Sequence, residues 1–183
     1  MGRIARKSPG FKARMAGVFY LLTFLTGGVA LIVHGRLGFA AGLIAGACYL
    51  AVTLLFYYMF QPVNGSLSLL AALFSLVGCA IGPLSLFVHA ASHISPLVFF
   101  GFYCLLIGYL IFSSTFLPRI LGVLMAFAGL GWLTFLSPPL ADHLSPYNLA
   151  PGLVGEGALT LWLLVMGVNA PKWEEKKRLA KRA

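Results

Sequence analysis

Six long apolar stretches constrain the fold of this chain more than any other feature of its sequence. The hydrocarbon core of a bilayer is roughly 30 Å thick and is crossed by about 20 helical residues at about 1.5 Å each. No water in that core can pair with a free backbone, and the stretches lack the alternation of membrane strands, so we expect helices. The expected spans cover residues 15–33, 39–60, 67–88, 97–112, 120–136 and 152–168.

The composition supports this interpretation. Apolar residues make up 60% of the chain, charged residues 9%, and the mean hydropathy is +0.95, outside the usual balance of a soluble domain. The sequence therefore predicts an all-α, polytopic membrane protein with six transmembrane helices. Residues 15–169 are expected to form the membrane domain, between a basic N-terminal segment (1–14) and a basic tail (170–183). The first apolar run is expected to stay as an uncleaved anchor, because it is too long for a typical signal peptide.

The basic residues predict the orientation. Of the 13 Lys and Arg residues, all but Arg36 and Arg119 lie in the two end segments. Six spans place both ends on one side of the membrane, and the positive-inside bias makes that side cytoplasmic. The two ends also account for the net charge of +9. They are expected to rest against anionic lipid headgroups, whereas nucleic-acid binding is not expected, because no aromatic or folded platform accompanies them.

The few polar residues of the membrane domain gather on one predicted side. All four histidines are expected at the outer ends of the spans or in the outer loops, together with one arginine and two acids. Such a one-sided set suggests a shared polar cavity near the outer surface. The candidate cluster consists of His34, Arg36, His89, His93, Asp142, His143 and Glu156.

Glu156 is the most informative member of this set, because it is an acid within an apolar span. It lies about one turn into the sixth span, where an ionised carboxylate needs a partner or a water-filled pocket. It could act as a proton carrier, a metal ligand or a general base, with Arg36 as a possible counter-ion. A structural role is an equal alternative, because Pro151 suits a first turn and the helix dipole favours a carboxylate there.

His89 and His93 are the candidate metal ligands. Their i, i+4 spacing places both rings on one face if the third span continues through them, and His is the commonest ligand of transition metals. Zinc or haem is therefore possible, with further ligands from the rest of the cluster. The alternative is a solvated interfacial pair, because Ser95 and Pro96 indicate that the helix is ending.

Small, sulfur-containing and aromatic residues have structural interpretations. Small residues at close spacing predict helix contacts, cysteines in mid-span predict apolar packing, and aromatics near span ends predict an interfacial belt. The glycine pairs are Gly42 with Gly46, Gly78 with Gly82, and Gly129 with Gly131; the cysteines are Cys48, Cys79 and Cys104; the aromatics are Tyr57, Tyr58, Phe60, Trp132 and Trp173.

Four segments carry a family resemblance. These are ARMAGVFYLLTFLTG (13–27), QPVNGSLSLLAALFSLVG (61–78), LVFFGFYCLLIGYLIFSSTFLPRILGVLMAFAGLGWL (97–133) and GEGALTLWLLVMGV (155–168). The chain resembles a family of bacterial membrane proteins catalogued as domain of unknown function 4386. The resemblance implies a six-helix bacterial inner-membrane protein, with Gly155–Glu156 and Leu117–Pro118–Arg119 as typical features, and it supplies no reaction.

Two classes of function remain open from the sequence. The short loops and the scarcity of polar residues within the spans favour a non-catalytic helical bundle, or an accessory subunit that packs against other membrane subunits. The alternative is an outward-facing His/Glu site that binds a metal or haem and works as a hydrolase or a proton-coupled carrier. A carrier is expected to place polar groups near the midplane of the membrane, and the sequence offers only Gly82 and Pro83 there.

Overall fold

A computed structural model describes residues 8–84 and 95–180, except for the side chains of residues 82 and 83. His89 and His93 lie outside the described residues. Every regular element within these ranges is a helix. The α-helices are α1 (Pro9–Ile32), α2 (Arg36–Phe60), α3 (Gly65–Leu84), α4 (Pro96–Ser113), α5 (Arg119–Leu133), α6 (Pro138–Leu144), α7 (Ala150–Val165) and α8 (Ala170–Ala180), and two short 3₁₀ helices are η2 (Thr134–Leu136) and η3 (Tyr147–Leu149).

Each predicted span overlaps a helix, and the third does so as far as residue 84, where the described range ends. Five helical segments within the described ranges are long and apolar enough to cross a membrane: Pro9–Ile32, Arg36–Phe60, Pro96–Ser113, Arg119–Leu136 and Tyr147–Val165. Helix α3 is apolar over the shorter segment Gly65–Ile81. The helical fold class and the multi-pass architecture are therefore confirmed.

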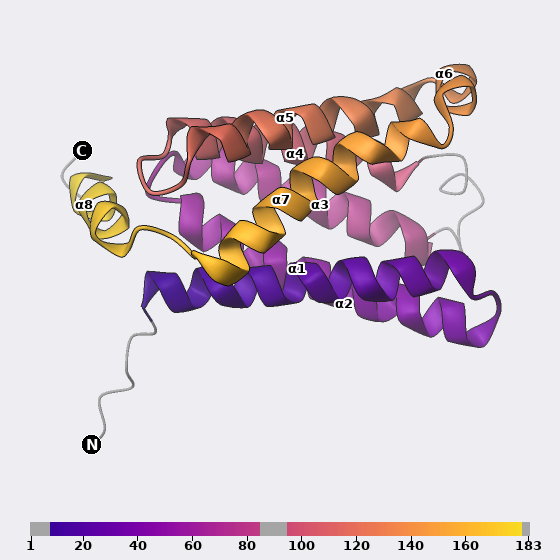
Figure 1. Ribbon diagram of the computed structural model, residues 1–183, viewed down its shortest axis with the longest axis horizontal. Coiled ribbons are helices and arrows are strands. Elements are labelled where there is room, and N and C mark those ends of the chain that lie inside the picture. Colours follow the sequence, from indigo (N-terminus) through magenta and orange to yellow (C-terminus); the bar gives the residue numbers. More distant parts are fainter. Residues whose placement is uncertain (1–7, 85–94, 181–183) are drawn as a thin grey trace.

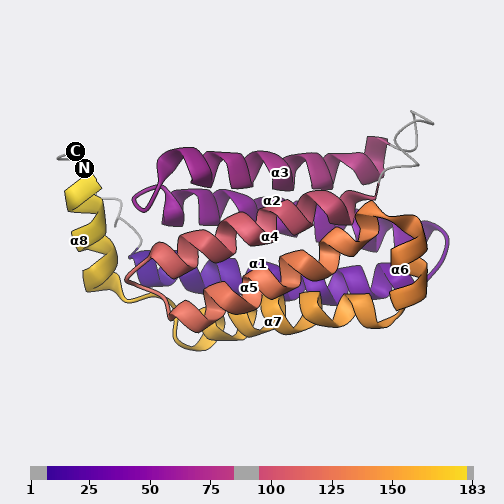
Figure 2. The same cartoon turned by 90° about the horizontal axis from the view of Figure 1, so that it is seen from above.

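The long helices run side by side along one axis (Figures 1 and 2). Helix α1 packs against α2 and α7, and α4 packs against α3 and α5, while α5 also packs against α7. Helices α2 and α3 are in contact as well. The helices therefore form a closed ring in the order α1, α2, α3, α4, α5 and α7. Helix α8 lies across one end of the bundle, and α6 lies at the other end (Figure 1).

Two hydrogen bonds fix the end of the bundle at which α8 lies. The Asn169 N–H donates to the Phe116 carbonyl oxygen at 3.1 Å, which joins the start of α8 to the link between α4 and α5. The Trp173 indole Nε1–H donates to the Met59 carbonyl oxygen at 2.9 Å, which joins α8 to the end of α2. The start of α1 lies at the same end (Figure 1). Arg36 lies at the opposite end of the bundle from α8, because it comes directly after α1, which spans the length of the bundle.

The segments predicted as loop and tail contain further helices. Helix α6 and η3 occupy the long connection before α7, and Pro138 and Pro151 stand in the first turns of α6 and α7. Proline suits this position because a first-turn N–H has no partner within the helix. Helix α1 already begins at Pro9, so Lys12 and Arg14 lie within its first turns.

Glycines hold several helices in close contact. A Cβ on Gly122 would lie 2.6 Å from the Gly108 carbonyl oxygen, so the backbones of α4 and α5 touch at this point. The predicted contact at Gly129 is confirmed, because a Cβ there would lie 2.8 Å from the Gly101 carbonyl oxygen. The predicted contact through Gly46 is wrong, because nothing lies within 4 Å of a Cβ built there. Close packing in lipid depends on which faces meet, and spacing alone does not specify that.

Candidate functional site

Glu156 is the centre of the candidate site. It lies in the second turn of α7, after Pro151, and its side chain is 5% exposed. Close packing holds this part of α7 in place, because Gly155 lies directly against the Leu124 carbonyl of α5. A side chain larger than hydrogen at position 155 would push α7 away from α5. The carboxyl group of Glu156 is thereby fixed inside the bundle.

Two neutral donors hold the carboxyl group of Glu156. The Tyr20 hydroxyl of α1 donates to Oε2 at 2.5 Å. The Trp132 indole Nε1–H of α5 donates to Oε1 at 2.5 Å. Each carboxyl oxygen therefore accepts one hydrogen bond, and the two bonds join three helices through a single side chain. Trp132 lies at the end of α5, and its N–H donates to a buried acid; its place in an interfacial belt stays a prediction.

The surroundings of Glu156 contain further polar groups. Cys104 lies beside the carboxyl group, and Tyr49 lines the same cavity, with its ring packed against that of Tyr20. The hydroxyl groups of Tyr49 and Tyr103 are buried and have no hydrogen-bond partner within the described part of the chain. Tyr20 and Cys104 lie halfway along the 24-residue helix α1 and the 18-residue helix α4. The polar cluster is therefore deep within the bundle and not at its rim.

A cavity of about 500 Å³ has Glu156 in its wall. It extends between the C-terminal half of α1, the N-terminal half of α2 and the first turns of α4 and α7, and its wall is mostly apolar. The polar groups in the wall come from Tyr20, Thr23, Tyr49, Cys79, Trp132 and Glu156; the other lining residues include Gly27, Gly28, Gly42, Gly46, Phe24, Phe100, Leu97 and Leu153. Such a size and composition are typical of small-molecule sites.

No basic side chain compensates Glu156 in the described ranges. Arg36, the expected counter-ion, is exposed at the start of α2, and no ion pair joins it to Glu156. A lone ionised carboxylate in an apolar interior costs many kcal/mol, because burial removes its hydration. Glu156 is therefore suited either to hold a proton or to pair with a cationic group that enters the cavity.

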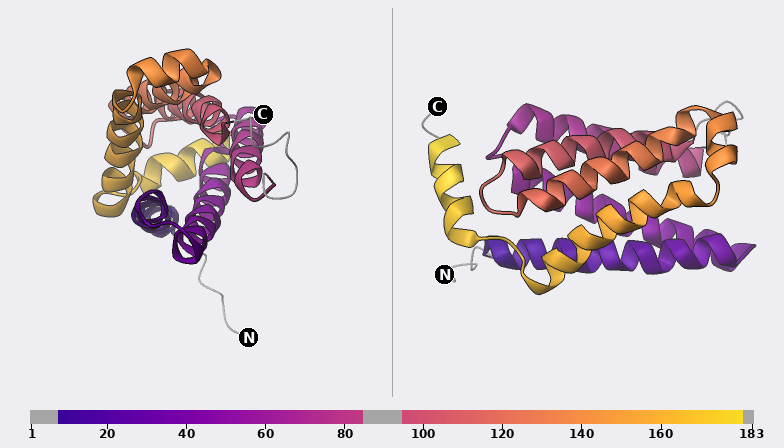
Figure 3. Two further views of the ribbon diagram at one scale, coloured as in Figure 1. Left: turned by 90° about the vertical axis from the view of Figure 1, so that its right-hand side faces the viewer. Right: turned by 45° about the horizontal axis from the view of Figure 1, so that its top comes forward.

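The other predicted residues do not assemble around Glu156. His34 and Arg36 are exposed near the link between α1 and α2, whereas Asp142 and His143 are exposed on α6. These two places lie on opposite sides of the same end of the bundle (Figure 3). Within residues 8–84 and 95–180, no group of three or more His, Cys, Asp or Glu is placed to hold a metal ion. The metal role of His89 and His93 stays a prediction.

Sequence reasoning missed Tyr20, Tyr49 and Trp132 as members of the site. A tyrosine in the middle of an apolar span was a usable signal, because a buried hydroxyl usually finds a hydrogen-bond partner. A glutamate on another span is the natural partner for such a hydroxyl. The sequence could not show which tyrosine reaches Glu156, since that depends on which helices are neighbours.

The fold and the cavity define a class of protein: a multi-pass helical membrane protein with a buried acid in the wall of a partly open cavity. Residues 83–167 match the family described as Domain of unknown function (DUF4386). The predicted resemblance is confirmed over this range, which contains α4, α5 and Glu156. A protein of Archaeoglobus fulgidus described as "Uncharacterized protein" is 29% identical over 125 residues, covering 63% of this chain and 75% of the relative. No solved structure matches the chain.

Proposed function

We propose that this chain is a non-catalytic inner-membrane protein that binds a lipid-soluble molecule inside its helix bundle. In this proposal α3 is the sixth membrane-spanning helix, and the end of the bundle at which α8 lies faces the cytoplasm. The distribution of charge supports this orientation. Of the described Lys and Arg residues only Arg36 is at the opposite end, and basic residues favour the cytoplasmic side, where anionic lipid attracts them.

The observation that carries the proposal is the mostly apolar cavity with Glu156 in its wall. Small-molecule sites combine apolar walls with a few polar groups that fix the orientation of the ligand. Here the apolar wall would accept a hydrocarbon chain or ring, and the carboxyl group would accept a hydrogen bond from the polar end of the ligand. Tyr20 and Trp132 already donate to the carboxyl group, so its orientation is set before a ligand enters.

The charge and hydrogen-bonding capacity of the Glu156 carboxyl group favour some lipid-soluble ligands over others. An amine would pair its positive charge with the carboxylate, and an alcohol would donate a neutral hydrogen bond. A fatty acid anion would place a second negative charge beside Glu156, which is unfavourable in a medium of low dielectric constant. The ligand class that fits is therefore an apolar molecule with one donor group, preferably cationic.

Calorimetric titration of the detergent-purified protein tests this proposal, with dodecylamine, dodecanol and dodecanoate as probes. We expect binding in the order amine, alcohol, carboxylate. The Glu156→Gln variant should lower dodecylamine affinity by at least about tenfold, because hydrogen bonds to charged groups contribute about 1.5–3 kcal/mol. It should change dodecanol affinity less, because glutamine keeps one acceptor oxygen.

A pair of glycine variants locates the binding site. Gly46→Leu fills the cavity, since Gly46 lines it and nothing lies within 4 Å of its Cβ position. Gly157→Leu is the matched control, because Gly157 is equally open but lies outside the cavity wall. Binding should be lost in the first variant and kept in the second. Equal dodecylamine binding in both variants would contradict the proposal, since uptake by micelles alone gives that result.

A proton-coupled carrier is the second candidate, and the depth of the polar cluster favours it. Carriers place their binding groups near the membrane midplane, and Tyr20 and Cys104 lie halfway along their helices. Proteoliposomes with an imposed pH gradient distinguish the two candidates. A carrier should move dodecylamine faster than empty liposomes do, and Glu156→Gln should abolish the difference, whereas a binding protein should give no such difference.

The remaining predictions from the sequence have their own tests. Elemental analysis and an absorption spectrum of the purified protein test the zinc or haem site at His89 and His93. Stoichiometric metal that disappears in the His89→Ala, His93→Ala double variant would establish that site. Co-purification with other membrane subunits at endogenous expression tests the accessory role.

A further inference from the structure

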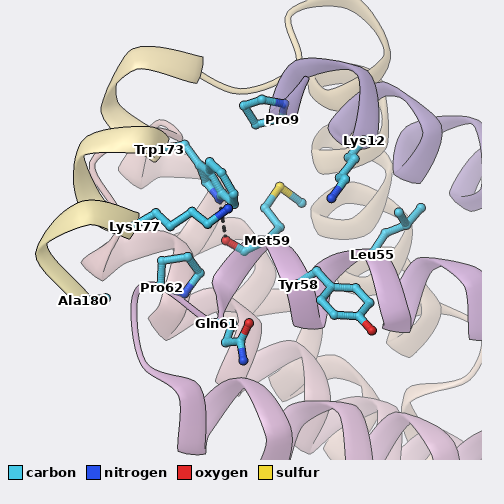
Figure 4. A pocket seen from close by; sticks show the side chains of 10 residues that line it. All are labelled: Pro9, Lys12, Leu55, Tyr58, Met59, Gln61, Pro62, Trp173, Lys177 and Ala180. Carbon is cyan, nitrogen blue, oxygen red and sulfur yellow. Dashed lines mark hydrogen bonds between the residues drawn. The ribbon is translucent and has the colours of Figure 1, made fainter. Parts of the chain in front are cut away.

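A second pocket, of about 390 Å³, lies at the end of the molecule where α8 crosses the bundle. It is formed where α1 begins, α2 ends and α8 crosses the bundle (Figure 4). Its wall includes Lys12 from α1, Leu55, Tyr58, Met59 and Gln61 from the end of α2, and Trp173 and Lys177 from α8.

Trp173 fixes α8 against the bundle and so creates this pocket. The residue is 8% exposed, and its Nε1–H donates to the Met59 carbonyl oxygen at 2.9 Å. The start of α8 is held as well, because the Lys172 N–H donates to the Asn169 side-chain oxygen at 3.2 Å. The pocket therefore has a defined shape, although it lies at the surface of the molecule.

Two lysines face this pocket from different helices. Figure 4 shows Lys12 of α1 and Lys177 of α8 extending toward Met59 from opposite sides. The Lys177 ammonium nitrogen lies 4.8 Å from the centre of the Trp173 ring, a cation–π contact that orients it. No acidic side chain lines the pocket, and no carboxylate of the described residues forms an ion pair with either lysine. The pocket is therefore positively charged and open to an anion.

The other walls have the character of a membrane interface. Tyr58 and Gln61 offer hydrogen-bonding groups beside the lysines, at the end of α2. Leu55 lies one turn further into the bundle and is apolar, and the buried side chain of Met59 continues the same face. A ligand that fits both parts has an anionic head and a hydrocarbon chain. Free phosphate would leave the apolar part of the wall empty.

We propose that this pocket binds the headgroup of one anionic phospholipid. The phosphate would lie between Lys12 and Lys177, and an acyl chain would follow Leu55 into the bilayer. Because α8 supplies Trp173 and Lys177, the bound lipid would tie α8 to α1 and α2. This site goes beyond the general attraction of basic tails to a charged membrane, because it requires two particular lysines in one place.

Native mass spectrometry of the full chain in a neutral detergent tests this inference. The probes are phosphatidylglycerol and phosphatidylcholine, which differ in net charge. We expect one phosphatidylglycerol to bind more tightly than any later one, and more tightly than phosphatidylcholine. The Lys12→Gln, Lys177→Gln double variant should lower the affinity of this first site about thirtyfold, because each lysine near a charged lipid surface contributes about 1 kcal/mol.

A charge-matched control separates a defined site from general attraction. The Arg14→Gln, Lys176→Gln double variant removes the same charge from the same two helices, α1 and α8, but neither residue lines the pocket. We expect it to change the first-site affinity by less than about threefold, because screened charges outside the site contribute little. Equal losses in both double variants would overturn the inference. So would equal binding of the two lipids, or displacement of the lipid by inorganic phosphate alone.

The test of the phospholipid site does not depend on whether the Glu156 cavity binds a ligand. The double variants leave Glu156, Tyr20 and Trp132 unchanged, so dodecylamine binding serves as the check that each variant is folded. A variant that loses lipid binding but still binds dodecylamine is folded, so its defect lies in the surface pocket alone. If the protein binds no amine at all, its unfolding temperature provides the same check, and the lipid comparison still decides the inference.

Discussion

Glycines on the two sides of the bundle serve opposite purposes. Between α4 and α5, the backbones at Gly108 and Gly122 approach so closely that a Cβ on either would meet the other's carbonyl oxygen within 2.7 Å. In the C-terminal half of α1 and the N-terminal half of α2, Gly28 and Gly46 have nothing within 4 Å of a Cβ position and line the cavity instead. The same residue type thus allows helices to touch on one side and leaves open space on the other.

Gly122→Leu should have the largest effect, because it tests the tightly packed side. The added side chain would meet the Gly108 carbonyl oxygen and the backbone of Phe112, which cannot move aside as a flexible side chain can. Overpacking of this kind costs about 3 kcal/mol or more. Denaturant unfolding in detergent measures the change in the free energy of unfolding. A loss below about 1 kcal/mol would show that α4 and α5 can separate without strain.

Glu156→Ala should have the next largest effect, because Glu156 links the two sides of the bundle. The variant leaves the Tyr20 hydroxyl and the Trp132 Nε1–H without their acceptor. An unsatisfied buried donor costs about 1–3 kcal/mol, so we expect a loss of about 3 kcal/mol in the free energy of unfolding.

Glu156→Gln is the control for this change, measured by the same unfolding experiment. Its amide oxygen can accept from Trp132, and its amide nitrogen can donate to the Tyr20 hydroxyl oxygen, which also accepts. We expect it to lose less than about 1 kcal/mol. If glutamine and alanine destabilise equally, the two hydrogen bonds are not what holds α1 and α5 to α7.

Tyr20→Phe should have a smaller effect on stability. It removes one hydrogen bond to Glu156 and keeps the ring, which packs at 5.5 Å between centroids against Tyr49. The expected loss is about 1 kcal/mol, the usual net contribution of a hydrogen bond. The same unfolding experiment measures it, with Tyr58→Phe as the control, because Tyr58 is 55% exposed and forms no bond to Glu156. Matching losses in the two variants would argue against a structural role for the Tyr20 hydroxyl.

Gly46→Leu should have the smallest effect on stability, which sharpens the contrast with Gly122→Leu. The new side chain enters open space, so the free energy of unfolding should stay within about 0.5 kcal/mol of the original value. The two variants add the same group to two helical glycines, and only the surroundings differ. A large loss at Gly46 would mean that the cavity does not have the size that the structure gives it.

The sequence by itself determined the long apolar helices, although not the shorter helices α6 and α8. Their positions follow from the length of each apolar stretch and from prolines at 118 and 151, because a helix in lipid must satisfy its backbone within its own segment. It also identified Glu156, since an acid within an apolar span is rare and costly. Both conclusions depend only on local sequence, and so they could be drawn without knowing which helices are neighbours.

The tertiary structure alone decided what surrounds Glu156. The sequence predicted Arg36 as its counter-ion and a contact at Gly46, whereas the structure brings Tyr20 and Trp132 to the acid and leaves Gly46 beside a cavity. The physical reason is that lipid is as apolar as the helix surfaces, so no pattern of hydrophobic residues marks the faces that meet. Those faces are chosen by close packing and by hydrogen bonds between side chains far apart in the chain, and both exist only in the folded bundle.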